Sequence, residues 1–182
     1  VYTPAVFEMI PKLLERTGTN DNGSITAFYT VLVDGDDMNE PIADTVRGVL
    51  DGHIILNRAL ANAYHYPAID VLPSISRLSN RVTGKQTKKA CAVLRGWMST
   101  YQARETMITS GVYQKGSSPE IDAAIDKHED IEKFLCQEEF EPCPMKDTLN
   151  KLSLLTGIEI PESEYAENPS ESNPNTEEMK KV

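Results

Sequence analysis

Residues 24–56, SITAFYTVLVDGDDMNEPIADTVRGVLDGHIIL, decide the fold class of this chain. The first ten of them are crowded with β-branched and aromatic side chains, which is typical of a largely buried strand. The acidic loop 34–41 then leads into a short helix whose apolar face consists of Ile42, Val46, Val49 and Leu50. Residues 53–56 are apolar enough for a second buried strand, and residues 58–63 for another helix. This alternation predicts an α/β fold with parallel strand pairing.

After this α/β part the sequence changes to long helical patterns. Apolar residues recur at helical spacing from Thr83 to Ile108, from Pro119 to Leu135 and from Met145 to Leu155, and an amphipathic helix is also predicted just after Pro4. Residues 159–182 hold seven acidic and two basic side chains with almost nothing to bury. We therefore expect an α/β part over residues 1–82, a helical domain over 83–157 and a disordered acidic tail over 158–182.

Charge and cysteine content exclude several classes of protein. The 182 residues include 18 basic and 28 acidic side chains, a net charge of −10, which disfavours binding to nucleic acid or anionic lipid. The three cysteines form no Cys-x-x-Cys pair, and no histidine stands at zinc-finger spacing, so neither a disulfide framework nor a metal site is predicted. A reducing compartment fits this pattern. The first residue is Val rather than Met, which we interpret as a fragment of a longer protein.

One block of the chain reverses the acidic balance. Between Val71 and Arg104 there is no acidic side chain, and seven basic ones occur: Arg77, Arg81, Lys85, Lys88, Lys89, Arg95 and Arg104. The lysines fit a solvated helix face as well as they fit a surface that binds an anion or a partner. Arg77 differs, because it follows the turn-rich residues 73–76, where a planar guanidinium can be held and aimed at phosphate oxygens. The pattern alone leaves both interpretations open.

Other motifs narrow the chemistry further. Tyr66 precedes a proline, and a ring placed there can either stack on a base or simply pack in the fold. The acidic loop lacks the ligand spacing and terminal glutamate of a calcium loop, so it is either solvated or faces a basic partner. The chain contains neither Gly-x-Ser-x-Gly nor His-Glu-x-x-His, and it contains no Gly-x-x-x-x-Gly-Lys-Ser/Thr. A complete nucleotide site is therefore not expected within these residues.

Seven stretches over roughly residues 1–137 together resemble the flagellar and type III secretion export ATPases, relatives of the catalytic subunit of rotary ATP synthases. These stretches are YTPAVF (2–7), PKLLER (11–16), GSITAFYTVLVDGDDMNEPIAD (23–44), RGVLDGH (47–53), HYPAIDVL (65–72), SISR (74–77) and GVYQKGSSPEID (111–122). The resemblance implies the C-terminal part of a P-loop (RecA-like) ATPase core over residues 1–82, followed by the family's α-helical C-terminal domain. Residues beyond Gln137 depart from the family pattern.

The resemblance also implies roles for individual residues. Arg77 matches the arginine finger, which reaches into a neighbouring subunit's site, and Tyr66 matches the ring that stacks on adenine. Phe134 and Phe140 resemble the second wall of the adenine pocket. The loop with Asp36, Asp37, Asn39 and Glu40 resembles the one that meets the central stalk, and residues 112–119 form the turn facing that stalk.

For the full-length protein the resemblance implies a homohexamer at the cytoplasmic face of the inner membrane that hydrolyses ATP with Mg²⁺ and energises protein export. The phosphate and metal ligands would lie outside this chain, which alone should be inactive. Its partners would be a central stalk protein, peripheral stator-like regulators, export substrates and their chaperones, but no nucleic acid, and it would meet the membrane only through the export apparatus. Flagellar and virulence export stay open alternatives. The other function is a non-catalytic interaction module that keeps the hexamer and stalk surfaces.

Overall fold

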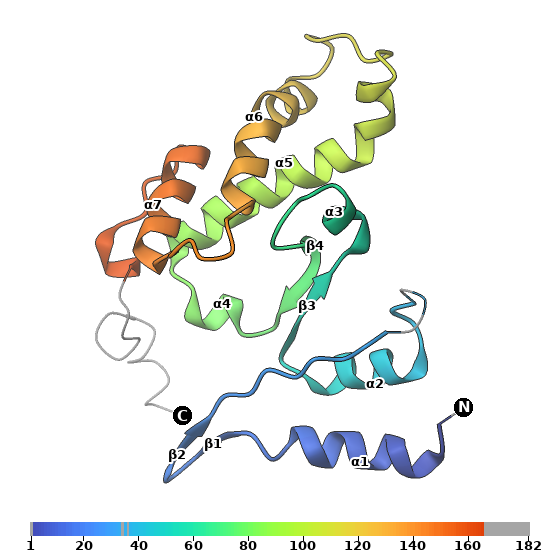
Figure 1. Cartoon of the computed structure of the whole chain (residues 1–182). Coiled ribbons are helices and arrows are strands. Elements are labelled where there is room, and N and C mark those ends of the chain that lie inside the picture. Colours follow the sequence, from blue (N-terminus) through green and yellow to red (C-terminus); the bar gives the residue numbers. More distant parts are fainter. Residues whose placement is uncertain (1, 34, 36, 166–182) are drawn as a thin grey trace. The chain divides into compact units, whose positions relative to one another are not determined.

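The computed structural model describes residues 2–33, 35 and 37–165, and the chain divides into two units, residues 1–53 and 54–182 (Figure 1). Each unit is described by itself. Among the described helices, none combines the length and the apolar character that a membrane span requires.

The first unit contains two helices and one small hairpin. Helix α1 (Pro4–Leu14) packs on α2 (Pro41–Val49), and the buried side chains are Leu14, Ala43 and Val46. Strands β1 (Gly18–Asn20) and β2 (Gly23–Ile25) pair antiparallel, with Gly18 opposite Ile25. Both helices fulfil the predicted periodicity.

The long apolar stretch of this unit differs from the prediction. Residues 26–33 form no strand, and the side chains of Phe28 and Leu32 are 90% and 89% exposed. A strand becomes buried only when neighbouring strands satisfy its backbone and other layers cover its faces. No strand of the described residues pairs with this stretch. It therefore lies outside any sheet, and Tyr29, Val31 and Val33 are only half-buried.

The second unit begins with a two-stranded sheet of β3 (Gly52–Leu56) and β4 (Ile69–Ser76), joined through α3 (Arg58–Asn62). The Ile55 N–H donates to Ser74 Oγ at 3.0 Å, whereas the amide of Asn57 donates to Asp70 at 3.0 Å. Contacts therefore move backward along β4 as they move forward along β3, an antiparallel order. The predicted parallel pairing concerned residues 24–33 and 53–56, so the order of β3 and β4 lies outside that prediction.

Strand β4 was also missed as a strand, because Pro73 and two serines made residues 73–77 look like a turn. Proline is tolerated in an edge strand, where its missing N–H faces away from the partner strand. In a two-stranded sheet both strands are edge strands. After β4 the chain makes the short helix α4 (Ser79–Val82).

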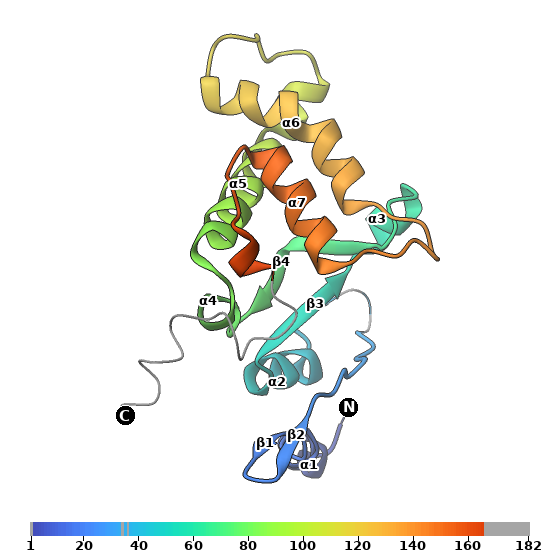
Figure 2. The ribbon, with the colours of Figure 1, turned by 90° about the vertical axis from the view of Figure 1, so that its left-hand side faces the viewer.

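Three helices complete the unit, as predicted: α5 (Lys85–Thr109), α6 (Pro119–Leu135) and α7 (Met145–Thr156). They pack on one another, and Figure 2 shows α6 and α7 crossing in front of α5. Their shared core consists of Ala90, Leu94, Ile131, Leu149, Leu152 and Ile160. Helix α5 also packs beside β4.

The folded part continues beyond Gly157, where the sequence predicts the start of the disordered tail. Ile160 is only 4% exposed in the helical core, and the 3₁₀ helix η2 (Glu162–Glu164) follows it. The Glu164 carboxylate accepts hydrogen bonds from Gln86 N (3.0 Å), Thr87 N (2.8 Å) and Thr87 Oγ1 (2.7 Å). Ile158 and Tyr165 also pack against the core, and the Tyr165 hydroxyl donates to Asn150 Oδ1 at 2.8 Å, so these contacts together hold a largely polar segment in place. Residues 166–182 of the predicted tail lie outside the described residues.

Candidate functional site

Arg77 stands directly after β4, on a strand whose backbone is fixed from α5. The guanidinium of Arg95 donates two hydrogen bonds, to Val71 O and Leu72 O, each 2.7 Å long. Such a planar fork holds two successive carbonyls at once and fixes the position of the strand. Arg77 itself is exposed at the strand's carboxyl end. Arg77 is therefore an exposed residue directly after a strand whose backbone Arg95 fixes.

Tyr66 lies in the turn between α3 and β4, and this turn is tied to the end of α6. The Gln137 N–H donates to Tyr66 O at 2.9 Å, and Nδ1 of the buried His65 lies 2.9 Å from Glu132 Oε2. The Tyr66 side chain is 52% exposed. Tyr66 is therefore a half-exposed tyrosine on a backbone that is fixed from the end of α6.

The two phenylalanines predicted for the adenine pocket have different environments. Phe134 lies on α6 and packs against the helical core, whereas Phe140 follows α6 and is 89% exposed. Phe140 belongs to the same segment as Gln137, which is bonded to the Tyr66 turn. The structure thus provides exposed rings on two connected segments, at Tyr66 and Phe140, and uses Phe134 for packing.

The acidic loop is shaped by its own polar groups. Asp37 Oδ1 accepts a hydrogen bond from Asn39 N at 2.9 Å, and Asp37 O accepts one from Glu40 N at 3.0 Å. Glu40 is the N-cap residue of α2, and its carbonyl accepts from Asp44 N. Asp37 and Asn39 are exposed, and Asp36 lies outside the described residues. The carboxylate of Asp37 therefore stabilises the loop itself, in addition to any contact that it makes with a partner.

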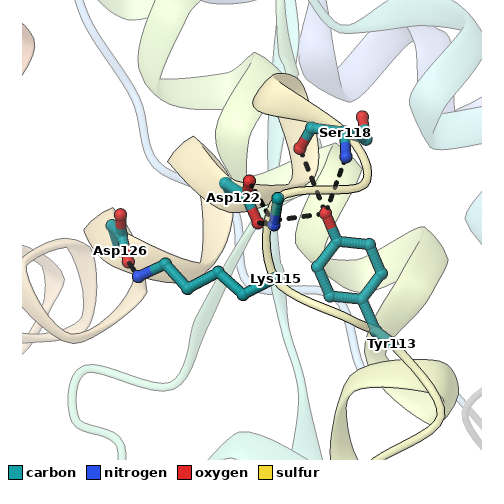
Figure 3. A network of polar contacts seen from close by, with 6 residues as sticks. Tyr113, Lys115, Ser118, Asp122 and Asp126 are labelled. Carbon is teal, nitrogen blue, oxygen red and sulfur yellow. Dashed lines mark hydrogen bonds and ion pairs between the residues drawn. The ribbon is translucent and has the colours of Figure 1, made fainter.

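The turn between α5 and α6 is held by a polar network (Figure 3). The Tyr113 hydroxyl donates to Asp122 Oδ1 at 3.0 Å and accepts from Ser118 N at 3.1 Å, while Gly116 N donates to the Asp122 carboxylate at 2.9 Å. Lys115 Nζ pairs with Asp126 at 2.6 Å. Partial burial, and then the bond to Asp122, raise the pKa of the Tyr113 hydroxyl, and the bond to Asp126 raises the pKa of Lys115. Because these hydrogen bonds and the ion pair restrain the turn between α5 and α6, its surface has a fixed shape.

A cavity of about 350 Å³ lies between β4 and the helices α5 and α6. Its lining includes Trp97, the stacked rings of Tyr101 and His128 (centroids 3.6 Å apart) and the His65–Glu132 pair. Cys136 lies beside this pair, so that one ligand atom from each of the three residues falls within 4.8 Å of the others. Sequence reasoning missed this cluster. Its only local signal is the four-residue spacing of Glu132 and Cys136, because His65 comes from a distant turn.

Comparison with known families agrees with these features. The model of the ATP synthase alpha/beta family, nucleotide-binding domain, matches residues 1–76, and the model of the type III secretion EscN ATPase C-terminal domain matches residues 83–153. The first match relates residues 1–76 to the ATP synthase alpha/beta family, and the second relates residues 83–153 to the type III secretion ATPases.

Individual relatives identify the branch. The chain is 54% identical over 159 residues to the flagellum-specific ATP synthase of Treponema pallidum and 52% identical over 151 residues to the SPI-2 type 3 secretion system ATPase of Salmonella typhimurium. These matches cover 87% and 83% of this chain but 36% and 35% of the relatives. The chain therefore belongs to the family of flagellar and type III secretion ATPases, and it spans about a third of the length of these relatives.

Solved structures agree at the level of the fold. The assembled ATPase EscN of enteropathogenic E. coli matches with a TM-score of 0.82 and 41% identity, over 85% of this chain and 38% of EscN. EscN in complex with its central stalk EscO matches with a TM-score of 0.76 and 39% identity, over 85% of this chain and 36% of that one. The predicted resemblance and fold class are thus confirmed.

Proposed function

We propose that this chain is part of a hexameric ATPase for protein export and supplies Arg77 to the ATP site of a neighbouring subunit. The observation that carries the proposal is the position of Arg77, exposed at the end of a strand that Arg95 fixes through two backbone carbonyls. Phosphoryl transfer is accelerated mainly by charge placed in advance at the transferring group. A planar guanidinium on a rigid strand meets that requirement.

The residues present fit one end of a bound ATP molecule. Tyr66 and Phe140 offer exposed aromatic faces for the base, and such stacking contributes about 1–3 kcal/mol per base. ATP would supply the phosphoryl group and Mg²⁺ would neutralise its charge. We propose that their remaining ligands come from other parts of the full-length protein, because no phosphate-binding loop motif occurs in these 182 residues. Phe134 keeps its predicted role only if the helical core lets its ring edge reach the base.

The test is made in the full-length protein. Arg77→Ala should lower ATP turnover by about 10³ to 10⁵-fold with a much smaller effect on nucleotide affinity, and Arg77→Lys should not restore it. Arg81→Ala is the matched control, because Arg81 is an exposed arginine four residues further on. Mixtures of Arg77→Ala subunits with inactive phosphate-loop mutants should regain activity, since each supplies what the other lacks. If no mixture regains activity, Arg77 does not act across an interface.

The stalk contact is a second part of the proposal. EscN has been solved with its central stalk EscO, and we assign a partner of the same kind to the acidic loop 36–40 and to the turn 112–119. The network around Tyr113 and Asp122 supports this, because a rigid exposed turn binds a partner with little loss of conformational entropy. We also propose regulators, export substrates and chaperones as partners, at the cytoplasmic face of the inner membrane.

A non-catalytic interaction module is the alternative function. The same rigid turn favours it, because that surface needs no nucleotide. The two functions differ in one observable: a Gly-Lys-Thr or Gly-Lys-Ser loop in the longer reading frame supports catalysis, and a full-length protein without such a loop supports the module.

A further inference from the structure

Three side chains that commonly bind transition metals come together at the end of α6. His65, Glu132 and Cys136 each place a ligand atom within 4.8 Å of the other two. His65 is buried, the Glu132 side chain is 44% exposed and Cys136 is exposed. A nitrogen, an oxygen and a sulfur ligand are therefore gathered in one place that solvent can reach.

The backbone holds these three residues in position. Glu132 and Cys136 lie one helical turn apart, and Cys136 N donates to Glu132 O at 3.0 Å. His65 N donates to Leu60 O at 3.0 Å, and the next residue accepts from Gln137 N at 2.9 Å. The bond from Gln137 to Tyr66 thus joins the turn to the end of the helix beside the cluster, and the other two bonds hold each segment in its local shape. Ligands held on rigid elements bind a metal without a large cost of ordering.

The ligand set favours zinc over the hard cations. Zn²⁺ is bound by imidazole nitrogen at about 2.0–2.1 Å, carboxylate oxygen at about 2.0–2.2 Å and thiolate at about 2.3 Å. Tetrahedral geometry then separates the nitrogen and oxygen ligands by roughly 3.3 Å, so the 2.9 Å His65–Glu132 contact must open only slightly. Mg²⁺ and Ca²⁺ prefer oxygen ligands alone. We propose that His65, Glu132 and Cys136 bind one Zn²⁺ or a similar divalent transition metal, with the fourth position open.

A bound ion would bridge the turn that carries Tyr66 and the end of α6. His65 and Glu132 also line the cavity beside α5, which offers a route for the ion and for a water ligand. The site is one residue from Tyr66, so occupancy would brace the ring that the proposed function assigns to adenine. Binding itself does not depend on that assignment and is measured without nucleotide.

The experiment titrates the reduced, metal-free 182-residue chain with Zn²⁺ against a chromophoric chelator, and with Co²⁺ followed by absorption. We expect one ion per chain and a cobalt–thiolate charge-transfer band in the near ultraviolet. Cys136→Ser should abolish that band, and both Cys136→Ser and Glu132→Gln should weaken Zn²⁺ binding at least about tenfold, since losing even an outer-shell partner costs about 10–100-fold. Both side chains reach solvent, so neither change should unfold the chain, which circular dichroism checks.

Cys143→Ser is the matched control, because Cys143 is also exposed but is not part of the cluster. It should leave the band and the affinity unchanged. Absence of equimolar binding by the wild-type chain overturns the proposal, as does a thiolate band that survives Cys136→Ser. Neither result would bear on the role of Arg77, which the turnover of the full-length protein tests separately.

Discussion

Replacing Glu164 by alanine removes the cap that joins the 3₁₀ helix η2 to the beginning of α5. Its carboxylate accepts three hydrogen bonds of 2.7–3.0 Å from Gln86 and Thr87, in the first turn of the helix. Gly84 precedes that turn, and a Cβ there would collide with the Glu164 carboxylate. The glycine thus leaves room for the cap, and the alanine variant would leave two backbone N–H groups without this partner.

The expected loss follows from the cap and the helix dipole. Removing a capping side chain costs about 0.5–2 kcal/mol, and a negative charge at a helix N-terminus contributes about 0.3–1 kcal/mol. Because Glu164 is partly exposed, we expect a total loss of about 1–2 kcal/mol. With a denaturant dependence of about 2 kcal/mol per M of urea, the unfolding midpoint should fall by roughly 0.5–1 M.

The same cap predicts a dependence on pH. Burial would raise the pKa of Glu164, but the hydrogen bonds from Gln86 and Thr87 outweigh it and lower that pKa below its ordinary value of 4.5. A carboxyl with a lowered folded pKa stabilises the protein above its unfolded pKa and loses that contribution as the pH falls through the folded pKa. The difference between wild type and Glu164→Ala should therefore be complete at neutral pH and shrink below about pH 4.5.

Urea unfolding followed by the fluorescence of Trp97 measures this loss, because Trp97 is the single tryptophan and packs against the helical core. Glu162→Ala is the control. Glu162 lies on the same 3₁₀ helix and has only an exposed ion pair with Lys146 at 3.8 Å, so its loss should cost a few tenths of a kcal/mol. Equal stability of the Glu164→Ala chain and wild type, or equal effects of the two variants, would refute the reasoning.

Three further predictions concern the turns and the isolated chain. Tyr113→Phe removes the hydroxyl that joins Ser118 to Asp122 and should lower stability by about 0.5–1.5 kcal/mol, with faster amide exchange at Gly116; unchanged exchange would contradict the network. In the full-length protein, changing Asp36, Asp37 and Glu40 to Asn, Asn and Gln should preserve basal ATPase activity but abolish its stimulation by the stalk protein, and wild-type stimulation should weaken with salt. Stimulation that persists at low salt would leave the loop as solvated surface. The purified 182-residue chain should hydrolyse no ATP above the buffer rate, and measurable turnover would show that the predicted dependence on an absent phosphate loop is wrong.

Much of the candidate site could be anticipated from sequence because motifs are local. Arg77 and Tyr66 were identified from the stretches around them, and the structure places both at exposed positions on fixed backbone. Phe134 shows the limit of this reasoning, since a phenylalanine in a matching stretch can equally be a core residue, and here it packs against the core. Whether a ring faces the core or solvent depends on which other segments pack against it. The periodicity of its own segment does not carry that information.

The sequence by itself determined family membership and the three long helices, because family motifs and the 3.6-residue helical periodicity are both patterns of residues close together in the sequence. Only the tertiary structure decided that residues 26–33 form no strand, that β4 pairs despite Pro73, and that Ile160 joins the helical core. The contacts responsible join distant residues: Glu164 caps a turn 77 residues earlier, and His65 meets Glu132 across 67 residues. Such pairs leave no periodic signal, because they are selected by packing and by the need to satisfy buried polar groups once the chain has folded.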